Sequence, residues 1–253
     1  MFKRTILIFL VLFFTMSCGS TFKLSAKDIL PRKGYVFVKK TVDVHACKKK
    51  KCFQDRLIAV GSGFVVKTTY KGSYVVTAAH VCLASKKLRA NPKFKFLTKL
   101  KVETLSGRYF KAKVLDYNSK NDVCMMFVED MVDDVEEVKM ASNKPEEGDK
   151  VFNIASPYGI HDYNIVPLFE GRYIGQNMDD DMYVFPAGPG SSGSMILNEK
   201  GELIGLLHSV YMRMNNIVLS TRYDDLKQFI RRNLIENAQE KPSRVNNYAA
   251  RKL

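Results

Sequence analysis

The sequence has little of what marks fibrous or disordered chains. Its 253 residues include 15 Gly and 8 Pro and show no internal repeat, which excludes collagen-like and low-complexity classes. Hydrophobic residues make up 46% and charged residues 26%, a globular composition. At about 100–200 residues per domain, the length fits one large domain or two small ones.

Long apolar runs are also missing beyond the N-terminus. Residues 5–16 are almost all apolar and follow Lys3 and Arg4. Such a run is too short to span a hydrocarbon layer of roughly 30 Å, so it predicts a signal peptide over residues 1–18, with an N-terminal membrane anchor as the alternative. Both interpretations predict an exported protein, either periplasmic, secreted or membrane-anchored. No later segment has the length of a transmembrane helix.

Cys18 follows this run directly, after the small residue Ser17 and before Gly19 and Ser20. The segment resembles a bacterial lipobox in which Thr15 replaces the usual Leu. This resemblance implies that Cys18 is lipidated and attaches the protein to a membrane. Ordinary signal-peptidase cleavage after Gly19 or Ser20 is the alternative.

Acidic residues are few, with 26 Asp and Glu against 40 Lys and Arg and a net charge of +14. Removal of Lys3 and Arg4 leaves 38 basic residues and a charge of +12, so the basic character belongs to the exported part. Residues 85–101 carry seven Lys or Arg and no acid. No nucleic-acid-binding motif accompanies them, and we expect no nucleic acid partner. A solvated face, or attraction to anionic cell-surface polymers, explains them better.

Four further cysteines are compatible with disulfides in an exported protein. Cys47 and Cys52 bracket four lysines, and a disulfide between them would close a hairpin tip. No second pair of Cys or His has the spacing of a metal site, so we expect neither a metal nor a cofactor. Cys82 and Cys124 are either paired or separate buried thiols, and the sequence leaves both alternatives open.

Short apolar segments rich in Val, Ile, Phe and Tyr alternate with turn residues, which predicts an all-β sandwich or barrel. They form two sets joined through residues 132–148. The predicted strands are 35–44, 58–67, 74–79, 108–115, 123–128, 151–155, 165–173, 182–185, 194–197, 202–209 and 217–220.

The C-terminal part has a different period. Its apolar positions recur at helical spacing and predict one amphipathic α-helix over residues 223–237. These positions are Leu226, Phe229, Ile230, Leu234 and Ile235. The polar segment 238–253 carries four basic residues, and we expect a basic disordered tail there.

Three short motifs contain residues typical of catalysis. The first is GSGF at 61–64 with TAAH at 77–80, the second is ND at 121–122 before an apolar strand, and the third is GSSGS at 190–194. Each is ordinary when taken alone. Together and in this order they resemble the trypsin-like serine proteases of the chymotrypsin fold, closest to the bacterial HtrA-like proteases and glutamyl endopeptidases.

The resemblance implies two antiparallel six-stranded β-barrels, over residues 34–142 and 143–222, with a triad of His80, Asp122 and Ser192. Ser192 would be the nucleophile, His80 its general base and Asp122 the residue that orients the base. The order His, Asp, Ser is that of chymotrypsin-like enzymes and differs from the orders in α/β-hydrolases and subtilisins.

The same resemblance assigns the oxyanion hole to the backbone N–H groups of Gly190 and Ser192. Ser191 stands where the trypsins have an Asp that pairs with a newly freed N-terminus. Because Ser191 is uncharged, we do not expect that activation mechanism here. We also expect no PDZ-like domain after residue 222.

The substrate pocket is expected between the segment before the nucleophile and the strand after it. The candidate residues are Phe185, Pro186, Ala187, His208, Ser209 and Val210. Glutamyl endopeptidases bind a substrate carboxylate with a His on that strand, but His208 is shifted by one residue, and such a shift turns a side chain to the other face of a strand. A preference for Glu and a preference for small or apolar side chains therefore both stay open.

These observations predict a serine endopeptidase that acts on protein or peptide substrates through an acyl-enzyme intermediate. The alternative is a catalytically inactive, protease-like binding module at the cell surface. The intact set of His80, Asp122 and Ser192 argues for the enzyme. His45 and His161 have no partners in sequence and are expected on the surface or in loops.

Overall fold

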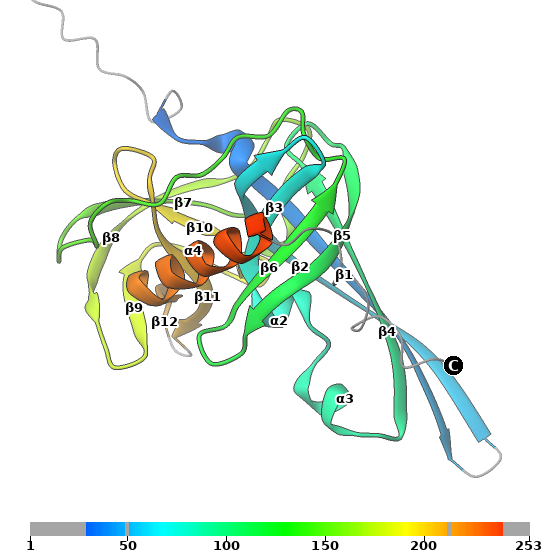
Figure 1. Ribbon diagram of the computed structural model, residues 1–253. Helices are drawn as coiled ribbons and strands as arrows, with labels where there is room; N and C mark the ends of the chain where they lie inside the picture. Colours follow the sequence, from blue (N-terminus) through cyan, green and yellow to red (C-terminus); the bar gives the residue numbers. More distant parts are fainter. Residues whose placement is uncertain (1–28, 49–50, 212–213, 240–253) are drawn as a thin grey trace, which may run out of the picture.

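The computed structural model describes residues 29–48, 51–211 and 214–239. Figure 1 shows two β-barrels with one helix lying across them. The all-β prediction of two closed six-stranded antiparallel barrels and one C-terminal helix is confirmed. The N-terminal region 1–28, with the predicted signal peptide and Cys18, lies outside the described residues.

The first barrel follows a short 3-10 helix, η1 (Arg32–Gly34). Its strands are β1 (Tyr35–Lys48), β2 (Lys51–Thr69), β3 (Gly72–Ala78), β4 (Phe94–Thr104), β5 (Tyr109–Asn118) and β6 (Val123–Glu129). They close in the order β1-β2-β3-β6-β5-β4, and closure leaves no unpaired barrel edge. The short helices α2 (Ala79–Cys82) and α3 (Lys86–Ala90) follow β3.

The sequence pattern did not predict β4. Its residues Leu100, Val102 and Thr104 are buried and alternate with the exposed Lys99 and Lys101. This is the period of two expected for a strand with one face in the core. The lysines hide the pattern, since they give the segment the composition of a solvated surface.

The second barrel holds β7 (Lys150–Ile154), β8 (Leu168–Gln176), β9 (Asp180–Val184), β10 (Met195–Leu197), β11 (Leu203–Tyr211) and β12 (Met214–Thr221). They close in the order β10-β11-β12-β9-β8-β7. The chain crosses between the barrels at residues 138–139: the Val138 N–H donates to Val65 of the first barrel (2.8 Å), and the Lys139 carbonyl accepts from Leu203 of the second (2.7 Å). The boundary predicted from the sequence was 142–143.

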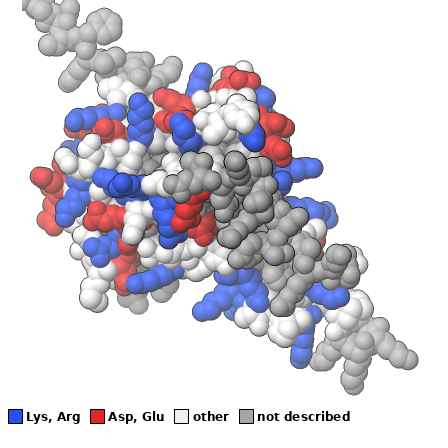
Figure 2. All heavy atoms as spheres, in the orientation of Figure 1, with Lys and Arg blue, Asp and Glu red and all other residues white. Residues whose placement is uncertain are grey.

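Strands β1, β2 and β4 extend beyond the first barrel, and a disulfide joins Cys47 to Cys52 near the end of the β1–β2 hairpin. Val42 and Val44 on one face of this extension pack with Leu88 of α3. Lys and Arg side chains gather over α3 and the extension, where acidic side chains are sparse (Figure 2). The exposed ones here include Lys86, Lys87, Arg89, Lys93 and Lys95. The basic segment predicted from the sequence is thus a surface of this extension.

Helix α4 (Tyr223–Gln239) contacts both barrels. Its buried residues Leu226, Phe229 and Ile230 belong to the core cluster that runs from one barrel into the other. Asn233 near its C-terminal end donates to Asp116 of β5 (3.0 Å). The helix ends at Gln239, two residues beyond the predicted end, so the predicted tail begins two residues too early, and residues 240–253 lie outside the described residues. No helix among the described residues has both the length and the apolar character to cross a membrane.

Asp181 anchors the start of α4 to the second barrel. The N–H of Tyr223, the first residue of the helix, donates to the Asp181 carboxylate (2.6 Å), and the Tyr173 hydroxyl donates to the same group (3.1 Å). Asp181 lies on β9 and is 3% exposed. Burial raises its pKa, although these two donors oppose the rise. A negative charge at a helix N-terminus is favourable. Here the charged carboxylate would also be buried, and the loss of its hydration is unfavourable.

This raised pKa predicts a pH-dependent loss of stability. As pH rises above the ordinary Asp value of 3.8, the unfolded chain loses the Asp181 proton first, so the free energy of unfolding falls until the folded group also ionises. Asp181→Asn removes this step. Urea unfolding between about pH 4 and pH 7 should show a smaller decline for Asp181→Asn than for the wild type. The exposed neighbour Asp179, changed to Asn, is the control, and an equal decline in all three proteins would contradict the role of Asp181.

Candidate active site

His80 and Asp122 lie side by side because β3 and β6 are neighbours in the first barrel. Ala78 at the end of β3 pairs with Val123 at the start of β6. His80 follows in α2, and Asp122 precedes β6 with φ 49°. The His80 Nδ1 lies 2.6 Å from the Asp122 Oδ2, and the His80 backbone N–H donates to Oδ1 (2.9 Å). The carboxylate therefore holds one ring nitrogen and leaves Nε2 for another partner.

Two links on the first barrel keep these residues together. The Ala79 N–H donates to the Asp122 carbonyl (3.0 Å). A buried disulfide joins Cys82 to Cys124, each two residues after a member of the pair. The structure thus shows the pairing that the sequence left open. Both links connect α2 to the start of β6, the two places from which the imidazole and the carboxylate project.

Lys40 supports the helix that carries His80. Its ammonium donates to the carbonyls of His80 and Leu83, both at 2.6 Å, from a side chain that is nearly buried. Burial lowers the pKa of Lys40, the positive charge of Arg89 lowers it further, and Asp122 acts in the opposite direction. A short helix leaves its last carbonyls without internal partners, and Lys40 supplies donors for them.

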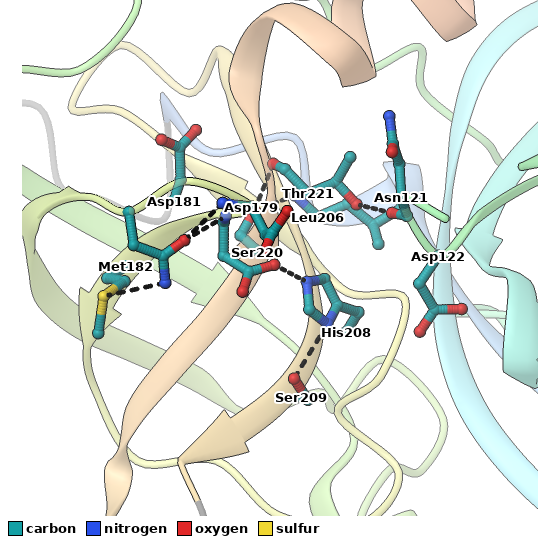
Figure 3. A network of polar contacts seen from close by, with 12 residues as sticks. Asn121, Asp122, Asp179, Asp181, Met182, Leu206, His208, Ser209, Ser220 and Thr221 are labelled. Atoms are coloured by element: carbon teal, nitrogen blue, oxygen red, sulfur yellow. Dashed lines mark hydrogen bonds and ion pairs between the residues drawn. The ribbon is translucent and has the colours of Figure 1, made fainter. Parts of the chain in front are cut away.

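The second barrel also reaches the acid of the pair. The Thr221 hydroxyl, at the end of β12, donates to the Asn121 carbonyl (2.7 Å), directly before Asp122. Figure 3 shows Thr221 and Asn121 joined in this way, with Asp122 following in the chain. Asp122 is therefore positioned from both barrels.

Ser192 lies in the second barrel on a sharp turn before β10. The flanking Gly190 and Gly193 have φ values of 99° and 85°, a region that favours glycine. A Cβ on Gly190 would collide with the Ser156 carbonyl oxygen. The Ser192 hydroxyl donates to the His208 carbonyl (3.4 Å), and no hydrogen bond joins it to His80 among the described residues. The Ser192 hydroxyl is thus engaged with the backbone of β11.

The N–H groups of Gly190 and Ser192 have no acceptor among the described residues. The carbonyl of Pro189, in the same peptide unit as the Gly190 N–H, accepts from the Tyr158 N–H (2.5 Å). Because the C=O and N–H of a trans peptide point in opposite directions, this bond turns the Gly190 N–H away from Tyr158. Two free donors beside a hydroxyl are the arrangement that stabilises an oxyanion.

Ser62 of β2 joins the first barrel to this turn. Its N–H donates to the Ser192 carbonyl (2.8 Å), and its hydroxyl donates to the Gly190 carbonyl (2.9 Å) and accepts from the Ser156 N–H (3.1 Å). The side chain is completely buried. The sequence marked Ser62 as part of a motif but gave it no role, since its partners lie far along the chain.

The predicted pocket residues differ in how exposed they are. Phe185 is 1% exposed and packs in the core of the second barrel with Tyr183, so its placement in the pocket was wrong. Pro186 is exposed, while Ala187 and Val210 are half-buried and pack against that same core. Of the six candidates, His208 is the one with a hydrogen bond to the proposed nucleophile among the described residues, through its backbone carbonyl.

His208 is held within the protein. Its Nε2 lies 3.0 Å from the Asp180 Oδ1, and its Nδ1 lies 3.0 Å from the Ser209 hydroxyl (Figure 3). The His208 side chain is 14% exposed. A substrate carboxylate would have to replace Asp180, which bears the same charge. The geometry therefore disfavours His208 as a receptor for Glu.

The two remaining histidines differ from each other. His45 is exposed, as expected. His161 lies in the loop between β7 and β8, as expected. Its side chain is only 17% exposed, however, and its Nε2 lies 3.0 Å from the Glu103 carboxylate. No local signal could have shown this, because 58 residues separate the two.

Known proteins resemble this chain in sequence. Residues 61–206 match the family described as trypsin-like peptidase domain. Two curated proteins named probable periplasmic serine endoprotease DegP-like are each 27% identical. The one from Marinomonas sp. (strain MWYL1) aligns over 63% of this chain and 32% of its own length, and the one from Buchnera aphidicola subsp. Baizongia pistaciae over 67% and 35%. The chain thus spans about a third of these relatives.

Solved structures show the same fold at lower identity. The serine endoprotease from Yersinia pestis has 17% identity and a TM-score of 0.58, over 84% of this chain and 66% of that one. An HtrA-type protease, AlgW, solved with a decapeptide, has 16% identity and a TM-score of 0.65, over 85% and 68%.

Ser62→Ala tests the junction between the barrels. The change leaves the Gly190 carbonyl and the Ser156 N–H without a buried partner, and we expect a loss of about 1–3 kcal/mol in the free energy of unfolding. We also expect slower labelling of Ser192 by a fluorophosphonate, because the turn is no longer fixed. Ser73→Ala is the matched control: this buried serine of β3 donates to the Met131 carbonyl and, among the described residues, has no hydrogen bond to the turn. Equal labelling rates in the two variants would rule out a positioning role for Ser62.

Proposed function

Because this chain belongs to the trypsin-like peptidase family, we propose that it is a serine endopeptidase that cleaves protein or peptide substrates, with Ser192 as the nucleophile. The observation that carries this proposal is the 2.6 Å contact between the His80 Nδ1 and the Asp122 Oδ2. It fixes the imidazole so that only Nε2 is free to accept a proton. The match to the family and the names of the relatives support the same activity.

The reaction uses each of these groups in turn. Ser192 Oγ attacks the substrate carbonyl while its proton passes to His80 Nε2, and Asp122 stabilises the imidazolium that forms. His80 then gives this proton to the leaving amine as the peptide C–N bond breaks, which leaves an acyl group on Ser192. A water molecule then attacks the acyl carbonyl while its proton passes to His80. His80 returns this proton to Ser192 Oγ as the ester bond breaks and the acid leaves. The N–H groups of Gly190 and Ser192 donate hydrogen bonds to the negatively charged oxygen that forms on the substrate carbonyl. Loss of one such donor typically slows the reaction about 10²–10³-fold.

The turn that holds Ser192 is supported by its own bonds. The Ser191 N–H donates to the Gly188 carbonyl (2.9 Å), and the Gly188 N–H donates back to the Ser191 hydroxyl (3.3 Å). Ser191 is completely buried. The uncharged Ser191 is satisfied by these local hydrogen bonds, whereas a buried Asp at this position would need a positively charged partner. We therefore propose that the active centre forms without the pairing of a newly freed N-terminus at this position.

The proposed location follows from the N-terminal segment and the relatives. Residues 1–18 have the pattern of a signal peptide, and the curated relatives are named periplasmic. We propose that the protein is exported. Attachment through a lipidated Cys18 is a further part of this proposal, supported by the resemblance to a lipobox alone.

The alternative of an inactive binding module gains no support from the comparisons, since the relatives are endoproteases by name.

The primary specificity is best described by the substrate side chains that the site disfavours. Asp180 already occupies the Nε2 of His208, so an acidic substrate side chain would meet a like charge there. Cleavage of a peptide library, with the cut sites identified by mass spectrometry, would define the accepted side chain.

Fluorophosphonate labelling tests the nucleophile directly. We expect the wild type to be labelled and Ser192→Ala to carry no label, with peptide cleavage reduced by about 10⁴-fold or more because the acyl intermediate cannot form. Ser142→Ala, which changes an exposed serine outside the site, should be labelled like the wild type. Label on Ser192→Ala, or a folded wild type that takes no label and cleaves nothing, would overturn the proposed function.

A further inference from the structure

The extension of the first barrel is a three-stranded sheet with two open edges. It comprises residues 41–48 of β1, 51–59 of β2 and 94–99 of β4, with β1 in the middle. Among the described residues, β2 pairs with β3 only from Phe64 onward, and β4 pairs with β5 only from Leu100 onward. The outer edges of the extension therefore have no partner strand there. Figure 1 shows the extension projecting away from both barrels, with α3 beside it.

One face of this sheet is apolar, and α3 covers only its middle. Val42 and Val44 are buried in a cluster with Leu88 of α3. Leu57 pairs with Val42, and Phe96 pairs with Val44, so both lie on the same face as these valines. They stand at the rim of the face and remain exposed, Leu57 to 46% and Phe96 to 37%.

Further large apolar side chains are exposed on the extension. Phe53 lies near its tip, next to the disulfide of Cys52, and is 52% exposed. Ile58 and Leu97 lie on the opposite face and are 59% and 50% exposed. Single exposed apolar residues are ordinary on a soluble protein, but a group of them on one projecting element marks an interaction site.

Basic side chains surround this apolar group. Asp43 and Asp55 are the acids among the described residues of the extension, and the Asp43 carboxylate lies 2.6 Å from Arg56 and 2.9 Å from Lys99. Residues 85–101 contain no Asp or Glu. Figure 2 shows the resulting excess of Lys and Arg over α3 and the extension. The exposed basic residues of this segment include Lys86, Lys87, Arg89, Lys93, Lys95 and Lys99.

This combination favours one class of partner. An anionic polymer would pair with the basic side chains but would leave the apolar ones in water. The surface of an anionic bilayer accommodates both, because apolar side chains enter the boundary between headgroups and acyl chains while Lys and Arg reach the negative headgroups. A fluid bilayer also needs no matching shape, which suits apolar side chains that point from both faces of a thin sheet.

We propose that the extension, together with α3, is a docking surface for an anionic lipid bilayer. Residues 83–85 join α3 to α2, which carries His80, so docking holds the proposed active centre near the bilayer. The docking itself does not rest on the proposed function. Its use, the cleavage of proteins at a membrane, does rest on that function.

Sedimentation with lipid vesicles tests the docking. Both barrels and α4 lie within residues 29–239, so a chain of residues 19–253 keeps the described fold. It lacks the apolar segment 5–16 and Cys18, which could attach to lipid by themselves. With Ser192→Ala in this chain, we expect binding to vesicles of mixed phosphatidylglycerol and phosphatidylcholine, and little binding to phosphatidylcholine alone. The binding should weaken as salt is added.

The apolar contribution is tested with the charges left intact. Ile58→Ser combined with Leu97→Ser should lower the binding constant for the anionic vesicles about tenfold, because these side chains no longer enter the bilayer. Ile174→Ser combined with Ile235→Ser is the matched control. These two isoleucines are 41% and 45% exposed on β8 and α4, away from the extension, and their replacement should leave binding unchanged.

The charge contribution has its own pair of variants. Lys86→Gln combined with Lys87→Gln should weaken binding about 30-fold, since each basic residue near an anionic bilayer contributes about fivefold. Lys144→Gln combined with Lys200→Gln removes the same charge from exposed positions outside the extension and should have a much smaller effect.

Three results would overturn the proposal. The first is a wild-type surface that binds no anionic vesicles. The second is binding to polyphosphate but not to these vesicles, which would assign the surface to a polymer. The third is equal vesicle binding by the unchanged extension and by both of its double variants, which would place the lipid contact elsewhere. Fluorophosphonate labelling of the chain with Ser192 intact is a separate test, so an unlabelled protein that binds vesicles refutes only the proposed function.

Discussion

The hydrogen bonds of Ser62 across the barrel interface are the constraint on which the rest of the active centre depends. The core is continuous from one barrel to the other, but burial of apolar surface has no preferred direction. Burial of apolar surface therefore brings the barrels together but does not fix the rotation of one barrel relative to the other. The backbone N–H and hydroxyl of Ser62 reach the carbonyls of Ser192 and Gly190, and their geometry admits one arrangement. The turn that carries the proposed nucleophile, Ser192, is thereby fixed against the first barrel, which carries the proposed base, His80.

The remaining links between the barrels act in the same sense. Thr221 holds the backbone before Asp122, and α4 is joined to Asp181 at its start and to Asp116 near its end. Each link contains a buried polar side chain, Thr221, Asp181 or Asn233, that is hydrogen-bonded to a different part of the fold. Leaving a buried polar group unpaired costs more free energy than its hydrogen bond contributes. Movement of one barrel against the other, which would break these bonds, is therefore strongly unfavourable. These polar links thus fix the relative position of two barrels that share an apolar core.

The sequence predicted features that neighbouring residues determine, and it missed contacts between residues far apart in the chain. Alternation of apolar residues located most strands, and contiguous motifs were enough to single out His80, Asp122 and Ser192. The contact of His161 with Glu103 was not predictable in this way, because periodicity reports the face of a residue and not its partner. Phe185 shows the same limit at short range: its position beside the nucleophile turn was correct, but its side chain points into the core.

Three histidines near the active centre show how partners decide chemistry. His208 has both ring nitrogens occupied, by Asp180 and Ser209, and offers Ser192 only its backbone carbonyl. His161 likewise has an oxygen atom facing each ring nitrogen. In both residues, each ring nitrogen thus faces a protein group, and none is open toward Ser192. His80 has one nitrogen held by Asp122 and the other without a protein partner among the described residues. Its half-exposed ring can therefore accept a proton at no cost in existing bonds. This difference in free nitrogens, rather than residue type, is why we propose His80 and not another histidine as the base.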